Sequence, residues 1–92
     1  MLKFSAAIRE GINLYPRQAF ECRHPSADSA CAAESAILYA KSINESLCAE
    51  DMYPENCRCP VGCNRNVSIV HLNDFHRWSR ELIADYYESL GY

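Results

Sequence analysis

The sequence predicts a mostly α-helical, small single domain of three to four helices with a Cys2His2 zinc knuckle in its C-terminal part. Apolar residues repeat at helical spacing in three segments, and two cysteines and two histidines follow the order C-x3-C-x7-H-x4-H. A chain of 92 residues supports one hydrophobic core, and a hydrophobic content of 49% indicates a folded protein. We therefore treat residues 1–92 as one domain, with a helical part at 1–56 and a metal-binding part at 57–92.

The N-terminal segment predicts a helix over residues 2–15. Its apolar side chains recur at every fourth residue and share one face: Phe4, Ile8 and Ile12. Ser5 is the predicted N-cap, because a serine hydroxyl accepts a hydrogen bond from a free N–H of the first helical turn. Pro16 ends the helix, since the residue before a proline avoids helical geometry.

A longer helix is predicted over residues 30–47, after the turn and capping signals of Asp28 and Ser29. Its alanine-rich composition favours a helix. A continuous apolar stripe runs along it: Ala33, Ile37, Ala40, Ile43 and Leu47. The stripe predicts the face that packs on the rest of the domain.

Two further helices are predicted near the C-terminus. Residues 67–75 fit either a strand or a short helix, and we favour the helix, which residues 73–74 then break or cap. The last helix follows Ser79, its predicted N-cap, and ends near Gly91. Five residues form its predicted apolar face: Leu82, Ile83, Tyr86, Tyr87 and Leu90.

The metal-binding part offers four candidate ligands: Cys59, Cys63, His71 and His76. Thiolates and imidazoles are the ligands that Zn²⁺ takes in tetrahedral structural sites. Only seven residues separate the second cysteine from the first histidine, against about 12 in a ββα finger, which predicts a knuckle followed directly by one helix. Because four protein ligands fill the site, the predicted zinc is structural and has no position for a substrate or an activated water.

Cys57 is an alternative ligand, because three cysteines and one histidine also make a zinc-binding set. We favour Cys59, since Pro60 and Gly62 shape a tight turn directly after it. Such a turn aims the two sulfurs that flank it at one point.

The two histidines are five residues apart, which on a regular α-helix directs their side chains about 140° apart. A local break at residues 73–74 would let both rings converge. Asp74 is expected either to accept the second N–H of a metal-bound imidazole or to cap the next turn. Trp78 is predicted to pack over the knuckle and to seal the junction between the two C-terminal helices.

Six cysteines in 92 residues fit either a three-disulfide scaffold or a reduced chain that uses some thiols on metal. Residues 1–15 carry charges and no apolar run of signal-peptide length, which favours the cytoplasm and free thiols. No stretch reaches the roughly 20 apolar residues of a membrane span. Cys31 is expected to be a small buried residue, and the sequence assigns no role to Cys22 or Cys48.

The metal-binding part resembles a family of small proteins of phages and bacteria. The resemblance rests on the cysteine pair of residues 59–63 and on the run H-L-N-D-F-H-R-W-S-R-E-L-I-A-D-Y over residues 71–86. The family pattern there is H-L-N-D-x-H-x-W-[ST]-R-E-x-I-A-x-W, so Tyr86 stands where the pattern has tryptophan. The resemblance implies a phage or prophage setting, action in the cytoplasm and the same Cys2His2 ligand set. It implies no particular activity.

A formal net charge of −3 disfavours a nucleic-acid binder, whose affinity depends largely on neutralising phosphates. We therefore expect a protein-interaction module that binds a host protein or protein complex, for example a CRISPR effector of the host defence. An acidic loop would suit a partner with a basic groove: Glu50, Asp51 and Glu55. An enzyme is not expected, because the chain has neither a nucleophile motif nor a glycine-rich phosphate loop.

Two alternatives stay open. The first is a zinc-knuckle nucleic-acid-binding protein, since four arginines surround the proposed site: Arg58, Arg65, Arg77 and Arg80. The second is a homodimer through the tyrosine-rich C-terminal end: Tyr86, Tyr87 and Tyr92.

Overall fold

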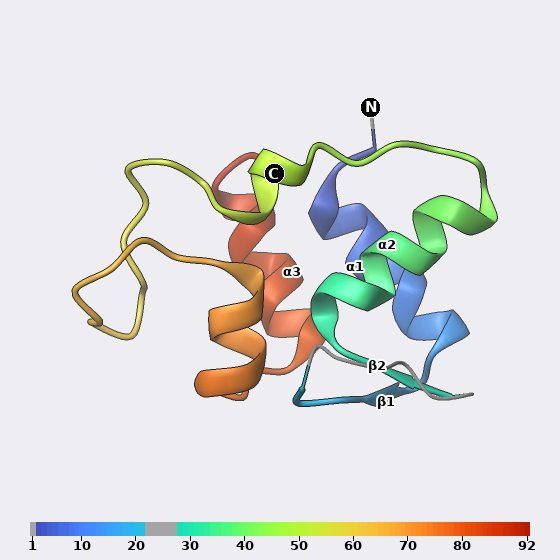
Figure 1. Cartoon of the computed structure of the whole chain (residues 1–92), viewed down its shortest axis with the longest axis horizontal. Helices are drawn as coiled ribbons and strands as arrows, with labels where there is room; N and C mark the ends of the chain where they lie inside the picture. Colours follow the sequence, from blue (N-terminus) through green and yellow to red (C-terminus); the bar gives the residue numbers. More distant parts are fainter. Residues whose placement is uncertain (1, 22–27) are drawn as a thin grey trace.

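The computed structural model describes residues 2–21 and 28–92, and it confirms a mostly helical single domain (Figure 1). Its elements in chain order are α1 (Phe4–Leu14), β1 (Arg17–Gln18), β2 (Ser29–Ala30), α2 (Ala32–Ser42), the 3-10 helix η1 (Ala49–Met52), the π-helix η2 (His71–Phe75) and α3 (Arg80–Ser89). None of the described helices is long and apolar enough to cross a membrane.

Helix α1 packs against both α2 and α3, and the core lies between the three helices and the η2 segment. The large buried side chains come from both halves of the chain: Phe4, Ile8, Val67, Ile69, Leu72, Ile83 and Tyr87. The predicted helical and metal-binding parts therefore share one hydrophobic core.

The start of α1 differs from the prediction. Lys3 occupies the N-cap position without a side-chain cap, and Ser5 lies buried inside the first turn. The backbone N–H of Ser5 donates instead to the carbonyl of Tyr92 at 3.1 Å. The C-terminal end of the chain thus supplies the acceptor that a capping hydroxyl would have provided.

Helix α2 is shorter than predicted, because it ends at Ser42 rather than at residue 47. Asn44 adopts a left-handed conformation with φ of 56°, a conformation that commonly ends a helix. Ile43, predicted to lie in the apolar stripe, is consequently 43% exposed. Leu47 still packs against the core, but it does so from the irregular segment that follows.

The state of Cys31 also differs from the prediction of free thiols. Cys31 is fully buried, as expected, but it is disulfide-bonded. It occupies the N-cap position of α2, where its sulfur accepts a hydrogen bond from the N–H of Glu34 at 3.3 Å. Cys22 lies outside the described residues.

A pair of two-residue parallel strands was not predicted. Arg17 of β1 pairs with Ser29 of β2, and Gln18 pairs with Ala30. Two residues give no readable alternation of apolar and polar side chains, so the sequence carried no strand signal here. The pair brings Gln18 and the start of α2 to the same edge of the domain, next to η2.

Helix α3 begins as predicted, since the Ser79 hydroxyl accepts a hydrogen bond from the N–H of Leu82 at 3.2 Å. Its apolar face is narrower than predicted, because Leu82 is 46% exposed. Tyr87 is fully buried, and its hydroxyl donates to the carbonyl of Met52 at 2.9 Å. This bond attaches η1 to α3. The burial of Tyr87 also makes it a core residue rather than a dimer contact.

Candidate metal centre

The two candidate cysteine ligands lie on a tight hairpin. The N–H of Cys59 donates to the carbonyl of Arg65 at 3.0 Å, and the N–H of Val67 donates to the carbonyl of Cys57 at 2.8 Å. The turn is closed by the N–H of Gly62, which donates to the carbonyl of Cys59 at 3.1 Å. Gly62 has a φ of 103°, which a residue with a side chain rarely adopts. The predicted Pro-Val-Gly turn is therefore present.

The two histidines lie at the ends of the wide helical turn of η2. The N–H of His76 donates to the carbonyl of His71 at 3.2 Å, five residues back rather than the usual four. This wider turn brings residues i and i+5 above one another, which a regular α-helix does not do. Ser68 holds the start of the turn, because its hydroxyl accepts from the N–H of His71 at 3.0 Å.

The predicted break at residues 73–74 is therefore a π-turn that runs through both residues, and it has the predicted effect on the rings. The ring centroids of His71 and His76 are 4.5 Å apart, and their planes are nearly perpendicular. Arg77 follows with a left-handed φ of 56°, and the N–H of Trp78 donates to the carbonyl of Leu72 at 3.0 Å. These features end the turn and lead the chain into α3.

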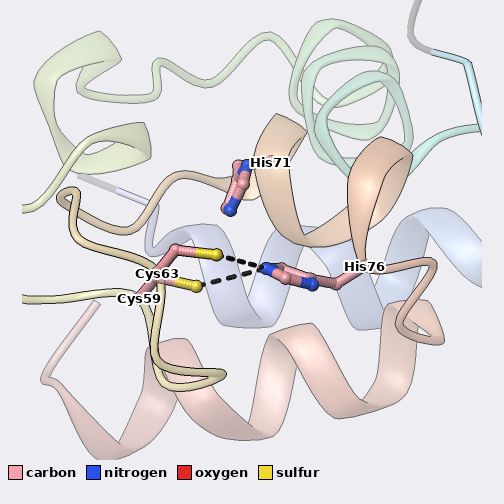
Figure 2. A group of neighbouring side chains, drawn as sticks. All are labelled: Cys59, Cys63, His71 and His76. Carbon is pink, nitrogen blue, oxygen red and sulfur yellow. Dashed lines mark hydrogen bonds between the residues drawn. The ribbon is translucent and has the colours of Figure 1, made fainter.

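All four candidate ligands converge on one point, as Figure 2 shows. Their donor atoms lie within 4.8 Å of one another, and we call this group the Cys2His2 cluster. The Nε2 atom of His76 lies 3.3 Å from the sulfur of Cys59 and 3.2 Å from that of Cys63. Ligand atoms around a tetrahedral zinc are about 3.3–3.8 Å apart, given Zn–S and Zn–N bonds of about 2.3 and 2.0 Å. The two distances from His76 are close to this range, and the full spread of 4.8 Å is about 1 Å wider, so a bound ion would draw the four donors slightly together.

The buried, neutral imidazole of His71 also fits a bound cation. The Nε2 atom of His71 is buried and has no hydrogen-bond partner among the described residues, a state that is costly unless the atom has a ligand. Burial, followed by the charges of Arg65 and His76, lowers the pKa of His71, so its imidazole is neutral and can donate a lone pair. Burial chiefly raises the pKa of Cys63, and a bound cation would reverse that preference.

Cys57 is not a member of the cluster. The group of neighbouring candidate ligands in the described chain contains Cys59 and not Cys57, which supports the preference for Cys59. Cys57 and Cys48 are free and partly buried, and the sulfur of Cys48 donates to a carboxylate oxygen of Glu50 at 3.1 Å.

The neighbours of the cluster were only partly predicted. One carboxylate oxygen of Asp74 accepts from the side-chain amide of Asn73 at 2.8 Å, a contact that neither predicted role included. Trp78 is half-buried against the core, with its ring edge-to-face with that of Tyr86 at 6.0 Å. Its position at the start of α3 agrees with the predicted packing at the helix junction.

Asn73 connects the cluster to the rest of the domain, and sequence reasoning missed this role. It is fully buried, and its carbonyl oxygen accepts from the Gln18 side chain at 2.8 Å and from the N–H of Ala32 at 3.0 Å. Its amide donates to the carbonyl of Ala19 at 3.0 Å and to Asp74. One side chain thereby ties η2 to β1 and to the start of α2. No spacing pattern marks such a residue in advance.

The network continues to the start of α3 through a buried arginine. Gln18 accepts from the N–H of Arg80 at 3.0 Å and donates to the carbonyl of Trp78 at 2.7 Å. The Arg80 guanidinium donates to the carbonyls of Tyr15 and Pro16 and to the hydroxyl of Ser35. Arg80 is only 2% exposed, so its predicted place in a basic surface patch is wrong.

No protein-family model matches this chain, and neither a curated protein nor a solved structure matches it. The class of protein is therefore defined by the fold and the site alone. The chain is a small helical domain with a Cys2His2 cluster that could hold a metal ion.

Proposed function

We propose that the Cys2His2 cluster binds one structural zinc ion and that the domain is a non-enzymatic protein-interaction module. The observation that carries the zinc assignment is the donor set, two sulfurs and two imidazole nitrogens within 4.8 Å of one another. Zinc takes this set in structural sites, whereas Mg²⁺ and Ca²⁺ take oxygen ligands. Four protein donors fill a tetrahedron, which supports a structural rather than a hydrolytic role.

Elemental analysis of the protein, purified without added metal, tests the zinc assignment. We expect one zinc per chain, and we expect Co²⁺ to replace it with the visible absorption of a tetrahedral thiolate site. Cys63→Ser should lose the bound metal, and Cys57→Ser, at a free cysteine outside the cluster, should keep it. Metal-free wild-type protein, or equal loss in both variants, would contradict the assignment.

The interaction role rests on what the domain presents to solvent. Phe75 and Tyr53 are 70% and 57% exposed, and both belong to the part of the chain around the cluster. Exposed aromatic side chains held by a rigid framework are common anchors of protein interfaces. The phage setting implied by the sequence resemblance makes a host protein or complex the proposed partner, with a CRISPR effector as the specific candidate.

Restored infection or transformation tests this partner. The wild-type chain would be expressed in bacteria whose CRISPR system rejects a matching plasmid. Cys63→Ser, which should lose the bound metal, would be expressed in the same bacteria as the control. Recovery of transformants with the wild-type chain only would support the proposal. Undiminished rejection with stably expressed wild-type protein would remove the CRISPR effector as a partner.

The nucleic-acid alternative loses one of the four arginines on which it rested. Arg80 is buried, and the guanidinium of Arg77 lies over the ring of Phe20 at 4.6 Å from the ring centroid. Arg58 and Arg65 stay exposed. Binding of an oligonucleotide that falls steeply with salt would revive this alternative.

We propose the cytoplasm as the place of action. Four free thiols support a reducing compartment: Cys48, Cys57, Cys59 and Cys63. The disulfide of Cys31 supports an oxidising one. Acid quenching of cells followed by alkylation in denaturant tests the proposal, because unfolding exposes the buried Cys31 and a cytoplasmic chain should then be alkylated there as well. An intact Cys31 disulfide under these conditions would contradict it.

A further inference from the structure

A groove beside the Cys2His2 cluster carries two exposed aromatic walls. Phe75 and Tyr53, 70% and 57% exposed, line a hollow of about 370 Å³, together with the partly buried Val70. His71 and Ser68 also line it. A volume of this size is at the lower end of the range for ligand pockets, and it suits one large side chain rather than a cofactor.

The Phe75 wall is held in place by the candidate metal ligands. Its ring stacks on that of His71 at 5.2 Å with an interplanar angle of 10°, and it meets His76 edge-on at 5.0 Å. An exposed aromatic ring that is already fixed loses little conformational entropy when a partner covers it. Rigid aromatic anchors of this kind often supply most of the affinity of an interface.

The two sides of Tyr53 differ in charge. On one side the groove is lined by one basic residue, Arg65, which is exposed and forms no ion pair with another described residue, and by one acidic residue, the partly buried Asp74. On the other side Tyr53 lines a second hollow of about 420 Å³. Three acidic residues and a second tyrosine complete the lining of this hollow: Glu50, Asp51, Glu55 and Tyr92.

We propose that this surface binds an extended peptide segment of a partner protein. An aromatic or large aliphatic side chain would occupy the groove between Phe75 and Tyr53. A neighbouring carboxylate would pair with Arg65, and a lysine or arginine on the other side would face the acidic hollow. The proposal rests on the proposed interaction function and specifies its site.

The charge pattern favours a peptide over a single strand of nucleic acid. A strand that stacked bases on Phe75 and Tyr53 would bring its phosphates toward the acidic hollow, where three carboxylates repel them. A peptide of mixed charge satisfies both ends of the surface.

A random dodecapeptide display library, selected on the zinc-loaded full chain, tests the proposal. We expect enriched peptides to place an aromatic or aliphatic residue beside Asp or Glu. A synthetic copy of the best peptide should shift the NMR signals of Tyr53, Arg65 and Phe75. Phe75→Ala and Arg65→Glu should each weaken its binding at least about tenfold, which corresponds to about 1.4 kcal/mol.

Leu82→Ala is the matched control, since Leu82 is an exposed apolar side chain on α3, 46% exposed, and does not line the groove. It should change the affinity less than about twofold. Zinc content and melting temperature are measured for every variant, because Phe75 contacts two candidate ligands. If Phe75→Ala loses zinc, the peptide affinities of Arg65→Glu and Tyr53→Ala test whether the peptide binds in the groove.

Four outcomes would overturn the proposal. Peptides that bind elsewhere, and are insensitive to both groove variants, would remove this site while leaving an interaction function intact. Tight binding of an oligonucleotide that displaces the peptide would assign the surface to nucleic acid. A dimer in sedimentation that dissociates in Phe75→Ala would assign it to a second copy of this chain. Failure to select any peptide would count against the interaction function itself.

Discussion

Gly11 of α1 lies directly against the backbone of Ser35 in α2. A Cβ atom added to Gly11 would be 2.2 Å from the Ser35 carbonyl oxygen and 2.6 Å from its carbon. No real contact is this short, so the two helices approach as closely as they do only because residue 11 has no side chain. A glycine inside a helix ordinarily weakens it, whereas Gly11 has a packing role here.

Gly11→Ala should therefore destabilise the domain, although the same change in an open helix gains about 1 kcal/mol. We expect a loss of about 1–3 kcal/mol in the free energy of unfolding, because the helices must separate. Urea denaturation measures it. Glu10→Ala, at the exposed neighbouring position, should change stability by less than about 0.5 kcal/mol. A stabilised Gly11→Ala would show that the helices are not in close contact.

Asn73→Ala should be among the most damaging single changes in the metal-binding part. It removes one side chain that accepts hydrogen bonds from the backbone N–H of Ala32 and the amide of Gln18 and donates one to the carbonyl of Ala19. Buried groups left without partners cost about 1–3 kcal/mol each in mutational data, so we expect a loss of at least about 2 kcal/mol.

Thermal and urea unfolding of the zinc-loaded protein measure this loss. Asn64→Ala is the control, because Asn64 is exposed and its side chain accepts one long hydrogen bond among the described residues, 3.4 Å from Arg58. Equal stability of the two variants would mean that the Asn73 network does not hold η2 to the helices.

Removal of zinc by a chelator should loosen the hairpin before the helices. Few backbone hydrogen bonds hold the cysteine hairpin, whereas α1 and α2 are secured by the core. Hydrogen exchange at the amides of Cys59, Arg65 and Val67 should accelerate at least about tenfold, and exchange in α1 should change far less. Added zinc should restore protection. Simultaneous loss of protection throughout the chain would instead indicate one global unfolding step.

Tyr87→Phe should cost about 1 kcal/mol, because it removes the 2.9 Å hydrogen bond to the Met52 carbonyl. Burial, the largest cause, raises the pKa of Tyr87 far above its usual range. The unfolded chain ionises this group near pH 10 and the folded chain does not, so stability falls as the pH rises above about 10.

The free energy of unfolding at pH 8 and at pH 10.5 checks both effects. Tyr87→Phe should lose less stability between these values than the wild type. Tyr53→Phe, at a side chain 57% exposed, is the control. If Tyr87→Phe and the wild type lost equal stability on alkaline titration, the buried hydroxyl would not be the group responsible.

Much of the fold and all of the cluster could be predicted from local signals. The ligand spacing identified Cys59, Cys63, His71 and His76, and the Ser79 cap and the Pro-Val-Gly turn are both present. These signals are local, because each lies within one continuous stretch of the chain. The metal identity and the partner stay predictions.

The remaining features depend on distant parts of the chain. Ser5 is not a cap because Tyr92, far away in sequence, supplies the acceptor. Arg80 is buried because carbonyls at the end of α1 meet the start of α3. Neither contact leaves a periodic pattern, so a reading of apolar spacing and caps cannot find it.

The wide turn between His71 and His76 also sets a rule for how this chain can change in length. Deleting one residue inside the turn would restore α-helical geometry with the two rings still on one face. The remaining residues of the turn would then be rotated relative to the domain, which would take Asn73 out of its hydrogen bonds with Gln18 and Ala32. Natural insertions and deletions should therefore fall in the irregular residues 43–48, and the count from His71 to Arg80 should stay fixed.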